Sequence, residues 1–271
     1  MELKIEHKTT YSYSEPVFLE PHHLYLYPSG RYIRNLHSFG ITLTPEPAGL
    51  ALRLDAENNA YYQCWFIGTH DRLEISVEME VQTDELNPLD FLIESKPILD
   101  HAEALKLYLH TDSPDKGMDS WIHEIEEAAC GNLITFLSTV NREICNGWEH
   151  KVRYQTSLME PEECFADLTG SCRDLSWMMI HIFRSRNIPA RFISGYAFNP
   201  ELEGHELHAW VEAWIPGGGW IGLDPSSGLF TTDHYVPLSA SFHPYNTLPV
   251  QGSYRGDGKS RLETVVNIYE L

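Results

Sequence analysis

The chain has 271 residues, of which 42% are hydrophobic and 12% aromatic, a composition typical of a globular protein and unlike that of a disordered chain. Its 39 acidic and 19 basic residues give a formal net charge of −20, which argues against a nucleic-acid backbone or an anionic membrane as a partner. No apolar run approaches the roughly 18 residues of a membrane span, and the first residues lack the apolar segment of a signal peptide.

The cysteines are five, an odd number, and no two of them have CxxC spacing: Cys64, Cys130, Cys145, Cys164 and Cys172. This pattern argues against a disulfide framework and against a four-thiolate zinc site, and it favours a reducing compartment. We therefore expect a cytoplasmic protein that uses no metal ion and no other cofactor.

Residues 1–83 alternate polar and apolar side chains in several short stretches separated by Pro, Gly and Asn. Alternation is the pattern of half-buried strands, and short strands repeated in this way predict an antiparallel β-sandwich. Residues 84–100 contain two prolines and are typical of a linker. We assign residues 1–95 to an N-terminal β-rich domain.

From about residue 100 the apolar residues follow a helical period. Three helices are predicted in succession, over residues 100–111, 119–131 and 132–147. Gly131 and Gly147 are expected to stop the second and third helices. A fourth helix is predicted to begin at Cys172, and its buried face recurs at three- and four-residue steps: Leu175, Met178, Met179, Ile182 and Phe183.

After Pro189 the pattern returns to strands, predicted over residues 190–198, 207–215 and 220–225. The Pro-Gly-Gly-Gly segment at 216–219 predicts a hairpin between the last two. The tail ends in RLETVVNIYEL, a predicted final strand. We assign residues 96–271 to one α+β domain, with helices packed on an antiparallel sheet and with the C-terminal strands included.

Three residues are candidate catalytic residues: Cys172, His208 and Asp224. A thiol near neutral pH is mostly protonated, so a nucleophilic cysteine needs a partner that favours its thiolate. The first turn of a helix supplies unpaired N–H groups, and a neighbouring imidazole can take the proton. A carboxylate on the other ring nitrogen would then fix the tautomer of the imidazole.

The hairpin decides whether Asp224 can reach His208, because side chains alternate between the two faces of a strand. In a hairpin without a bulge, the two residue numbers of every cross-strand pair have the same sum. His208 and Asp224 share a face only if this sum is even. A five-residue loop over 215–219 meets this condition by pairing Trp214 with Trp220 and Trp210 with Asp224. A four-residue loop would place Asp224 on the opposite face from His208.

Six motifs occur in a fixed order: Gly170-Ser171-Cys172-Arg173-Asp174, Ile188-Pro189-Ala190-Arg191, Ser194-Gly195-Tyr196, His208-Ala209-Trp210-Val211-Glu212, Gly219-Trp220 and Asp224-Pro225-Ser226. In these motifs, residues from about 140 to 230 resemble the transglutaminase-like superfamily, a papain-like Cys-His-Asp fold. Residues 1–83, with HKTTYSYSEPV near the start, resemble the β-rich N-terminal domain of bacterial members. The resemblance implies a papain-like α+β core preceded by an N-terminal β-sandwich.

The resemblance also implies a role for each candidate residue. Cys172 would be the nucleophile, His208 the general base and then acid, and Asp224 the residue that orients the imidazole. The backbone N–H of Cys172 would be one oxyanion donor. Tyr154 is our candidate for a second donor, with Trp148 behind it.

The sequence departs from the pattern of bacterial relatives in two places. Their motif usually reads Gly-Val-Cys-Gln-Asp, whereas Ser171 and Arg173 flank the cysteine here. Arg173 could lower the pKa of the thiol or point to solvent. Relatives often carry Gly-Arg-Asp-Tyr before a Pro-Val-x-Gly turn, but residues 241–245 here read Ser-Phe-His-Pro-Tyr. We expect an altered loop on the substrate side.

Taken one by one, these residues have simpler interpretations: a buried thiol, a core histidine and a turn-forming Asp224. Their joint occurrence favours catalysis, and we interpret the other four cysteines as structural. His205 and His208 could be taken for a metal-binding pair, but helical pairs of that kind favour four-residue spacing. The acidic residues Glu160, Glu162 and Glu163 are expected on a solvated face.

Three functions remain open from the sequence. The first is cysteine-dependent acyl transfer on peptide or protein amides through a thioester. The second is a peptidase or amidase that hydrolyses the same thioester, and the third is a non-catalytic binding module on this fold. The expected partner is a peptide or protein substrate, and the sequence leaves the oligomeric state undetermined.

Overall fold

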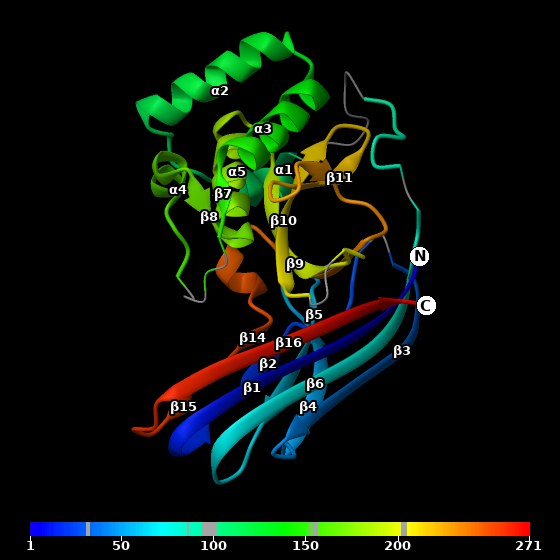
Figure 1. The fold of residues 1–271 in the computed structure, drawn as a ribbon, viewed down its shortest axis with the longest axis vertical. Helices are drawn as coiled ribbons and strands as arrows, with labels where there is room; N and C mark the ends of the chain where they lie inside the picture. Colours follow the sequence, from blue (N-terminus) through cyan, green and yellow to red (C-terminus); the bar gives the residue numbers. More distant parts are fainter. Residues whose placement is uncertain (31–32, 86, 94–101, 152, 154–156, 202–204) are drawn as a thin grey trace.

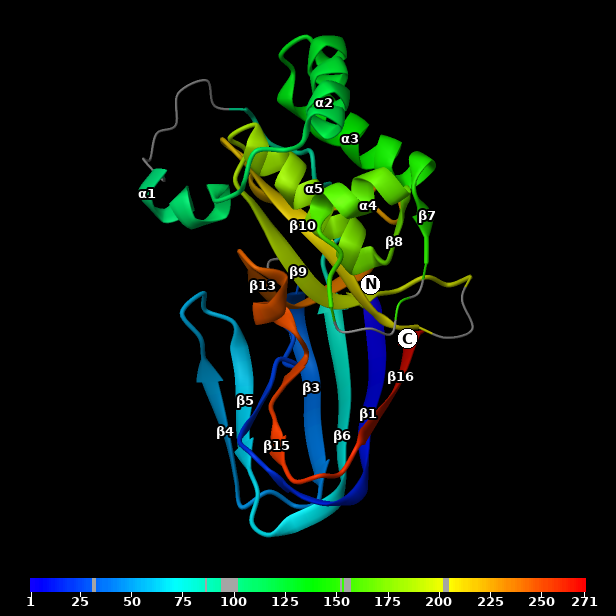
Figure 2. The same ribbon diagram turned by 90° about the vertical axis from the view of Figure 1, so that its left-hand side faces the viewer.

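The computed structural model of the protein describes residues 1–30, 33–85, 87–93, 102–151, 153, 157–201 and 205–271. Its chain forms two packed parts, a β-sandwich and an α+β core, which lie one below the other in Figures 1 and 2. The N- and C-terminal residues lie close together where the two parts meet. We describe the sandwich first because it supports one side of the core.

Two antiparallel sheets form the sandwich. The first contains β1 (Glu2–Leu19), β3 (Ile33–Thr44), β6 (Thr69–Thr83), β15 (Tyr254–Arg255) and β16 (Ser260–Glu270). The second contains β2 (His22–Leu24), β4 (Gly49–Leu54), β5 (Ala60–Trp65) and β14 (Val250–Gln251). Alternate residues of β6 are buried in the shared hydrophobic cluster, which confirms the strand pattern predicted for residues 1–83: Leu73, Ile75, Val77, Met79 and Val81.

The C-terminal strands belong to the sandwich, so our assignment of them to the domain 96–271 is wrong. β16 runs antiparallel along β1, with Leu3 opposite Glu270 and Tyr13 opposite Ser260. Val266 and Ile268 of β16 are almost fully buried in the sandwich cluster. The long-range pairing satisfies the backbone groups on one side of β1, which would otherwise form an open edge.

The helices of the core are α1 (Ala102–Leu105), α2 (Lys116–Ala129), α3 (Leu133–Gly147), α4 (Pro161–Asp167) and α5 (Cys172–Ser185). The first two residues of the helix predicted over 100–111 lie outside the described residues. The remainder ends earlier than predicted, because the chain tightens into the 3₁₀ helix η1 (Lys106–Leu109) directly after α1. α2 begins earlier than predicted, because the Asp115 carboxylate accepts a hydrogen bond from Met118 N at 2.8 Å. α4 is a helix that the sequence analysis did not predict.

A five-stranded antiparallel sheet supports these helices. Its strands, in spatial order, are β12 (Leu229–Phe230), β11 (Gly219–Asp224), β10 (Leu207–Ile215), β9 (Ala190–Ala197) and β13 (Tyr235–Ser241). The apolar face of α5 packs on this sheet in one buried cluster with Ala209, Val211 and Ala213 of β10. This packing sets the start of α5 against the His208 end of β10.

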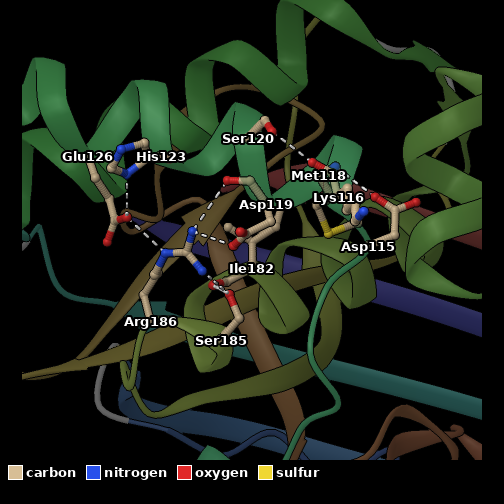
Figure 3. A network of polar contacts seen from close by, with 10 residues as sticks. All are labelled: Asp115, Lys116, Met118, Asp119, Ser120, His123, Glu126, Ile182, Ser185 and Arg186. Carbon is tan, nitrogen blue, oxygen red and sulfur yellow. Dashed lines mark hydrogen bonds and ion pairs between the residues drawn. The ribbon is translucent and has the colours of Figure 1, made fainter.

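Ion pairs attach α2 to the C-terminal end of α5 (Figure 3). The Arg186 guanidinium, just after α5, donates to Asp119 at 2.8 Å and to Glu126 at 2.9 Å. The Arg186 side chain is 18% exposed, so these contacts are only partly screened by water. They hold the outer helix over the core without entering the candidate site.

The sandwich also holds the segment that we expected to differ from relatives. Glu57, in the turn between β4 and β5, accepts hydrogen bonds from Ser241 Oγ, from Phe242 N at 3.2 Å and from Tyr108 Oη at 2.9 Å. Asn59 exchanges two hydrogen bonds with the backbone of Ala240, at 2.8 and 2.9 Å. The start of the segment 241–245 is therefore fixed by the N-terminal part of the chain.

Within the described ranges, none of the helices combines the length and the apolar character that crossing a membrane requires.

Candidate active site

The β10–β11 hairpin has the register that the candidate triad requires. Trp214 lies opposite Trp220 and Val211 lies opposite Leu223, so the paired numbers have an even sum, as predicted. The loop is shorter than the predicted five residues, because Ile215 and Gly219 also pair. Because the loop loses one residue at each end, every pair keeps its partner and the side chains stay on the predicted faces of the strands. His208 and Asp224 accordingly meet, with 2.8 Å between His208 Nε2 and Asp224 Oδ2.

Asp224 is held by two further donors besides His208. The Tyr235 hydroxyl donates to Oδ2 at 2.8 Å, and the backbone N–H of Ser226 donates to Oδ1 at 2.9 Å. The Asp224 side chain is only 3% exposed. Burial would raise the pKa of this carboxyl, but the His208 imidazole and the two donors lower the pKa below its usual value.

The His208 imidazole is 19% exposed and directs Nε2 at the carboxylate. Nδ1 is thus the ring nitrogen left for proton exchange with Cys172. Burial favours the neutral ring, but the charge of Asp224 and the contact with Cys172 raise the pKa of His208 well above its usual value. The ring therefore holds a proton readily beside a thiolate.

The start of α5 is fixed by a capping box around Ser171 and Asp174. The Asp174 carboxylate accepts hydrogen bonds from Ser171 N at 2.9 Å and from Ser171 Oγ at 2.6 Å. It also accepts from Met159 N at 2.9 Å and forms an ion pair with Arg153 at 2.7 Å. Ser171, which departs from the usual motif, thus has a structural role in positioning the first helical residue.

Cys172 is that first residue, and its side chain is partly exposed. Burial of the thiol opposes ionisation, but contacts with His150 and His208 outweigh it and lower the pKa of Cys172 to about 6. The guanidinium of Arg173, the next residue, donates to the backbone carbonyl of Arg153 at 3.2 Å. Two imidazoles thus favour the thiolate.

The other cysteines lie in different environments. Cys64 and Cys164 are fully buried, and burial raises the pKa of their thiols to about 11 and about 12 respectively. Burial also raises the pKa of Cys145, whose thiol faces the carbonyl of Ser226. Cys130 is exposed at the end of α2, where its φ of 50° marks a left-handed helix cap. Its structural role stays a prediction.

His150 is the site residue that sequence reasoning missed. It ends the short strand β7 (Glu149–His150), which pairs in parallel with β8 (Thr169–Gly170) just before Cys172. The proximity of Cys172 raises the pKa of His150 above its usual value. The signal in the sequence was weak, because two-residue strands have no detectable alternation.

The predicted oxyanion residues have separate outcomes. Tyr154 lies outside the described residues, so its role stays a prediction. Trp148 is buried, and its indole N–H donates to the carbonyl of Cys164 at 2.9 Å, which leaves it no free donor for the site. The Cys172 backbone N–H remains a candidate because it lies at the helix start.

Helix α5 beginning at a cysteine, on an antiparallel sheet that brings His208 to Asp224, defines a papain-like, transglutaminase-like core. Residues 126–225 match the transglutaminase-like superfamily, and residues 3–82 match the bacterial transglutaminase-like N-terminal region. These two matches agree with the resemblance of the motifs to the transglutaminase-like superfamily.

Curated relatives match only parts of the chain. An uncharacterized protein of Mycobacterium leprae is 32% identical over 109 residues, which are 38% of this chain and 38% of that protein. A protein-glutamine gamma-glutamyltransferase of Pseudomonas aeruginosa is 34% identical over 70 residues, 23% of this chain and 10% of that enzyme. The chain thus spans well under two thirds of these relatives.

The whole fold has a counterpart among crystal structures. A protein of Cytophaga hutchinsonii, described as a candidate cysteine protease, aligns with a TM-score of 0.76 at 18% identity. The alignment covers 100% of this chain and 91% of that protein. The sandwich and the core therefore occur together in that protein as well. With the two family matches, this fold supports a cysteine-dependent activity in general terms.

Proposed function

We propose that the protein is a cysteine-dependent enzyme that transfers acyl groups from peptide or protein amides through a thioester. The observation that carries the proposal is the contact between the Cys172 thiol and the His208 imidazole, which Asp224 orients. Contacts with His150 and His208 lower the pKa of the thiol to about 6, and Asp224 orients His208 at 2.8 Å. A scaffold without catalytic function has no need of a thiolate at neutral pH.

In the proposed first step, the Cys172 sulfur attacks the carbonyl carbon of an amide and a sulfur–carbon bond forms. The carbon–nitrogen bond then breaks, and the leaving amine takes a proton from the His208 imidazolium. Asp224 keeps the ring in the orientation that this transfer needs. The product is a thioester on Cys172 and a free amine, or ammonia when the donor is a glutamine side chain.

In the second step, an amine or water attacks the thioester and gives its proton to His208. An amine yields a new amide, whereas water yields a carboxylate. Developing charge on the carbonyl oxygen needs donors, for which we propose the Cys172 backbone N–H and Tyr154. Substitution of Tyr154 by Phe is expected to lower kcat by about 10²-fold if its hydroxyl is such a donor.

Hydrolysis is the second candidate function, and the partial exposure of Cys172 favours it. Water that reaches the thiol can also reach the thioester, unless bound substrate excludes it. The likeness to the fold of the Cytophaga hutchinsonii protein agrees with this alternative without selecting it. The same residues perform both reactions, so the acceptor decides between them.

The test is incubation with glutamine-containing peptides, with and without a primary amine, followed by measurement of ammonia and of products by mass spectrometry. Acyl transfer predicts ammonia release together with an amine adduct on the peptide. Ammonia release without any adduct would overturn transfer and leave hydrolysis. The absence of both ammonia and a Cys172 thioester would overturn the enzymatic proposal.

We further propose a cytoplasmic location, on the basis of the odd number of cysteines, and a protein or peptide as the partner rather than a nucleic acid or a membrane. The five free thiols of the structure agree with a reducing compartment. Fractionation of the native host with an antibody against the protein checks the location. Recovery from the periplasm or from the membrane fraction would contradict it.

A further inference from the structure

A second imidazole, that of His150, lies at the nucleophile in addition to the His208 imidazole. β7 and β8 run parallel, with His150 opposite Gly170, and Cys172 follows Gly170 by two residues. The backbone N–H of Lys151 donates to the carbonyl of Gly170 at 2.9 Å. The N–H of Glu149 donates to the carbonyl of Leu168 at 2.8 Å. These bonds fix the His150 backbone beside the start of α5.

Trp148, the residue before β7, anchors this strand to the neighbouring helices. Trp148 is buried, its indole N–H is bonded to the Cys164 carbonyl, and its ring packs on Trp121 and Phe165 at centroid distances of 5.7 and 5.4 Å. Cys164 lies in α4, which packs on α5. β7 is thus anchored to the same body that carries Cys172, and His150 is not a loose surface side chain.

The two imidazoles differ in what holds them. His208 is largely buried and is oriented by Asp224, whereas His150 is exposed to solvent. The titratable groups that face His150 from the neighbouring elements are Cys172 of α5, His208 of β10 and Asp224 of β11. The two chain neighbours of His150, Glu149 and Lys151, form an ion pair with each other at 2.9 Å.

We propose that His150 is a second catalytic histidine, which donates a hydrogen bond to the Cys172 sulfur whenever that sulfur is anionic. This role rests on the proposed function and divides the work between the two imidazoles. His208 moves the proton, from the thiol to its own ring and then to the leaving amine. His150 keeps its proton and stabilises the thiolate in the resting site and again when the sulfur leaves the thioester.

The division predicts different consequences for the two residues. Loss of His208 removes proton transfer, but His150 still favours the thiolate, so Cys172 stays reactive below the usual thiol range of about 8.5. Loss of His150 leaves proton transfer in place, but the thiolate forms only at higher pH. A single-histidine site would lose both properties together when His208 is replaced.

The experiment measures the rate of iodoacetamide labelling of Cys172 against pH, by mass spectrometry of the labelled peptide, in folded variants checked by circular dichroism. In H150A the midpoint is expected to rise by about one pH unit, and labelling near pH 6 to fall correspondingly. H150Q retains an N–H donor without titrating near neutral pH, so its midpoint is expected between those of H150A and wild type. H123A, which removes an exposed histidine on α2, is the matched control and is expected to be unchanged.

Unchanged midpoints in both folded His150 variants would overturn the role of His150 while leaving the proposed function intact. A shift in H123A as large as that in H150A would also overturn this role, because the shift would then reflect the overall charge of the protein and not a contact with Cys172. A wild-type midpoint near 8.5 is a different failure, since it would overturn the proposed function itself.

Discussion

The sandwich and the candidate active site each contain a histidine and a cysteine with shifted pKa values, and the shifts have opposite directions. In the sandwich, His7 contacts the hydroxyls of Tyr196 and Thr9, both at 2.7 Å, and burial lowers the pKa of its ring to about 4. Cys64 is fully buried, and burial raises the pKa of its thiol to about 11. Both residues are therefore neutral near pH 7.

At the candidate active site in the core, His208 and Cys172 have pKa values shifted in the reverse directions. Burial opposes charge on His208 and on Cys172 as well, but each has a partner of opposite charge when ionised, and Asp224 adds a fixed carboxylate. The comparison shows that burial alone does not make a residue reactive. A buried group ionises where an adjacent group compensates its charge.

The largest effect is expected from removal of the nucleophile. C172A should lower ammonia release from glutamine peptides by about 10⁴-fold or more, because no other thiol is activated by a histidine pair among the described cysteines. C64A removes the buried thiol of the sandwich and is the matched control, with activity expected within about twofold of wild type. Comparable losses in the two variants would break the distinction between the two regions.

Replacement of the orienting carboxylate comes next. D224N keeps the size of the side chain but removes the charge that raises the pKa of His208, so kcat should fall by about 10³- to 10⁴-fold. NMR titration should show a lower pKa for His208 in this variant than in the wild type, a shift in the same direction as the one that burial causes in His7. An unchanged kcat in this variant would mean that Asp224 serves only the turn at Ser226.

The pH dependence follows from the same shifts. The thiolate forms as pH rises through the Cys172 pKa of about 6, so kcat/KM should increase up to tenfold per unit below that value. At high pH the His208 imidazolium loses the proton that the leaving amine needs. Because the pKa of His208 is raised, this descending limb should lie well above its usual pKa. A profile without an ascending limb near pH 6 would contradict the activated thiol.

The smallest effect is expected from a substitution in the sandwich, T9D. In T9D a carboxylate replaces the hydroxyl that lies 2.7 Å from His7 Nε2. The charge should raise the pKa of His7 from about 4 by about one unit or more, as Asp224 does for His208. NMR titration of the His7 ring protons measures this. A pKa that stays near 4 in the folded variant would mean that burial, rather than the missing carboxylate, separates the two histidines.

Local patterns in the sequence were enough to predict much of the site. The start of α5 at Cys172 and the even register of the hairpin depend on neighbouring residues, so periodicity and the turn around Pro216 sufficed. The helix predicted over 100–111 was too long, because the apolar period does not show where a helix tightens into a 3₁₀ turn.

Other features depend on contacts between distant parts of the chain. Tyr235 reaches Asp224 from another strand, and Asp174 is bonded by Met159 and Arg153 from the segment before α4. His150 meets Cys172 through a pair of two-residue strands. None of these contacts produces a periodic pattern in the sequence, so they could be identified only from the three-dimensional structure.

The pairing of β16 with β1 has a consequence for synthesis of the protein. A ribosome that adds roughly 5–20 residues per second makes the whole core between these strands, so β1 waits on the order of ten seconds or more for its partner. During that time one edge of the first sheet is open and can pair with another nascent chain. A polypeptide cut before Ser260 would keep Cys172, His208 and Asp224, yet it would retain this open edge permanently.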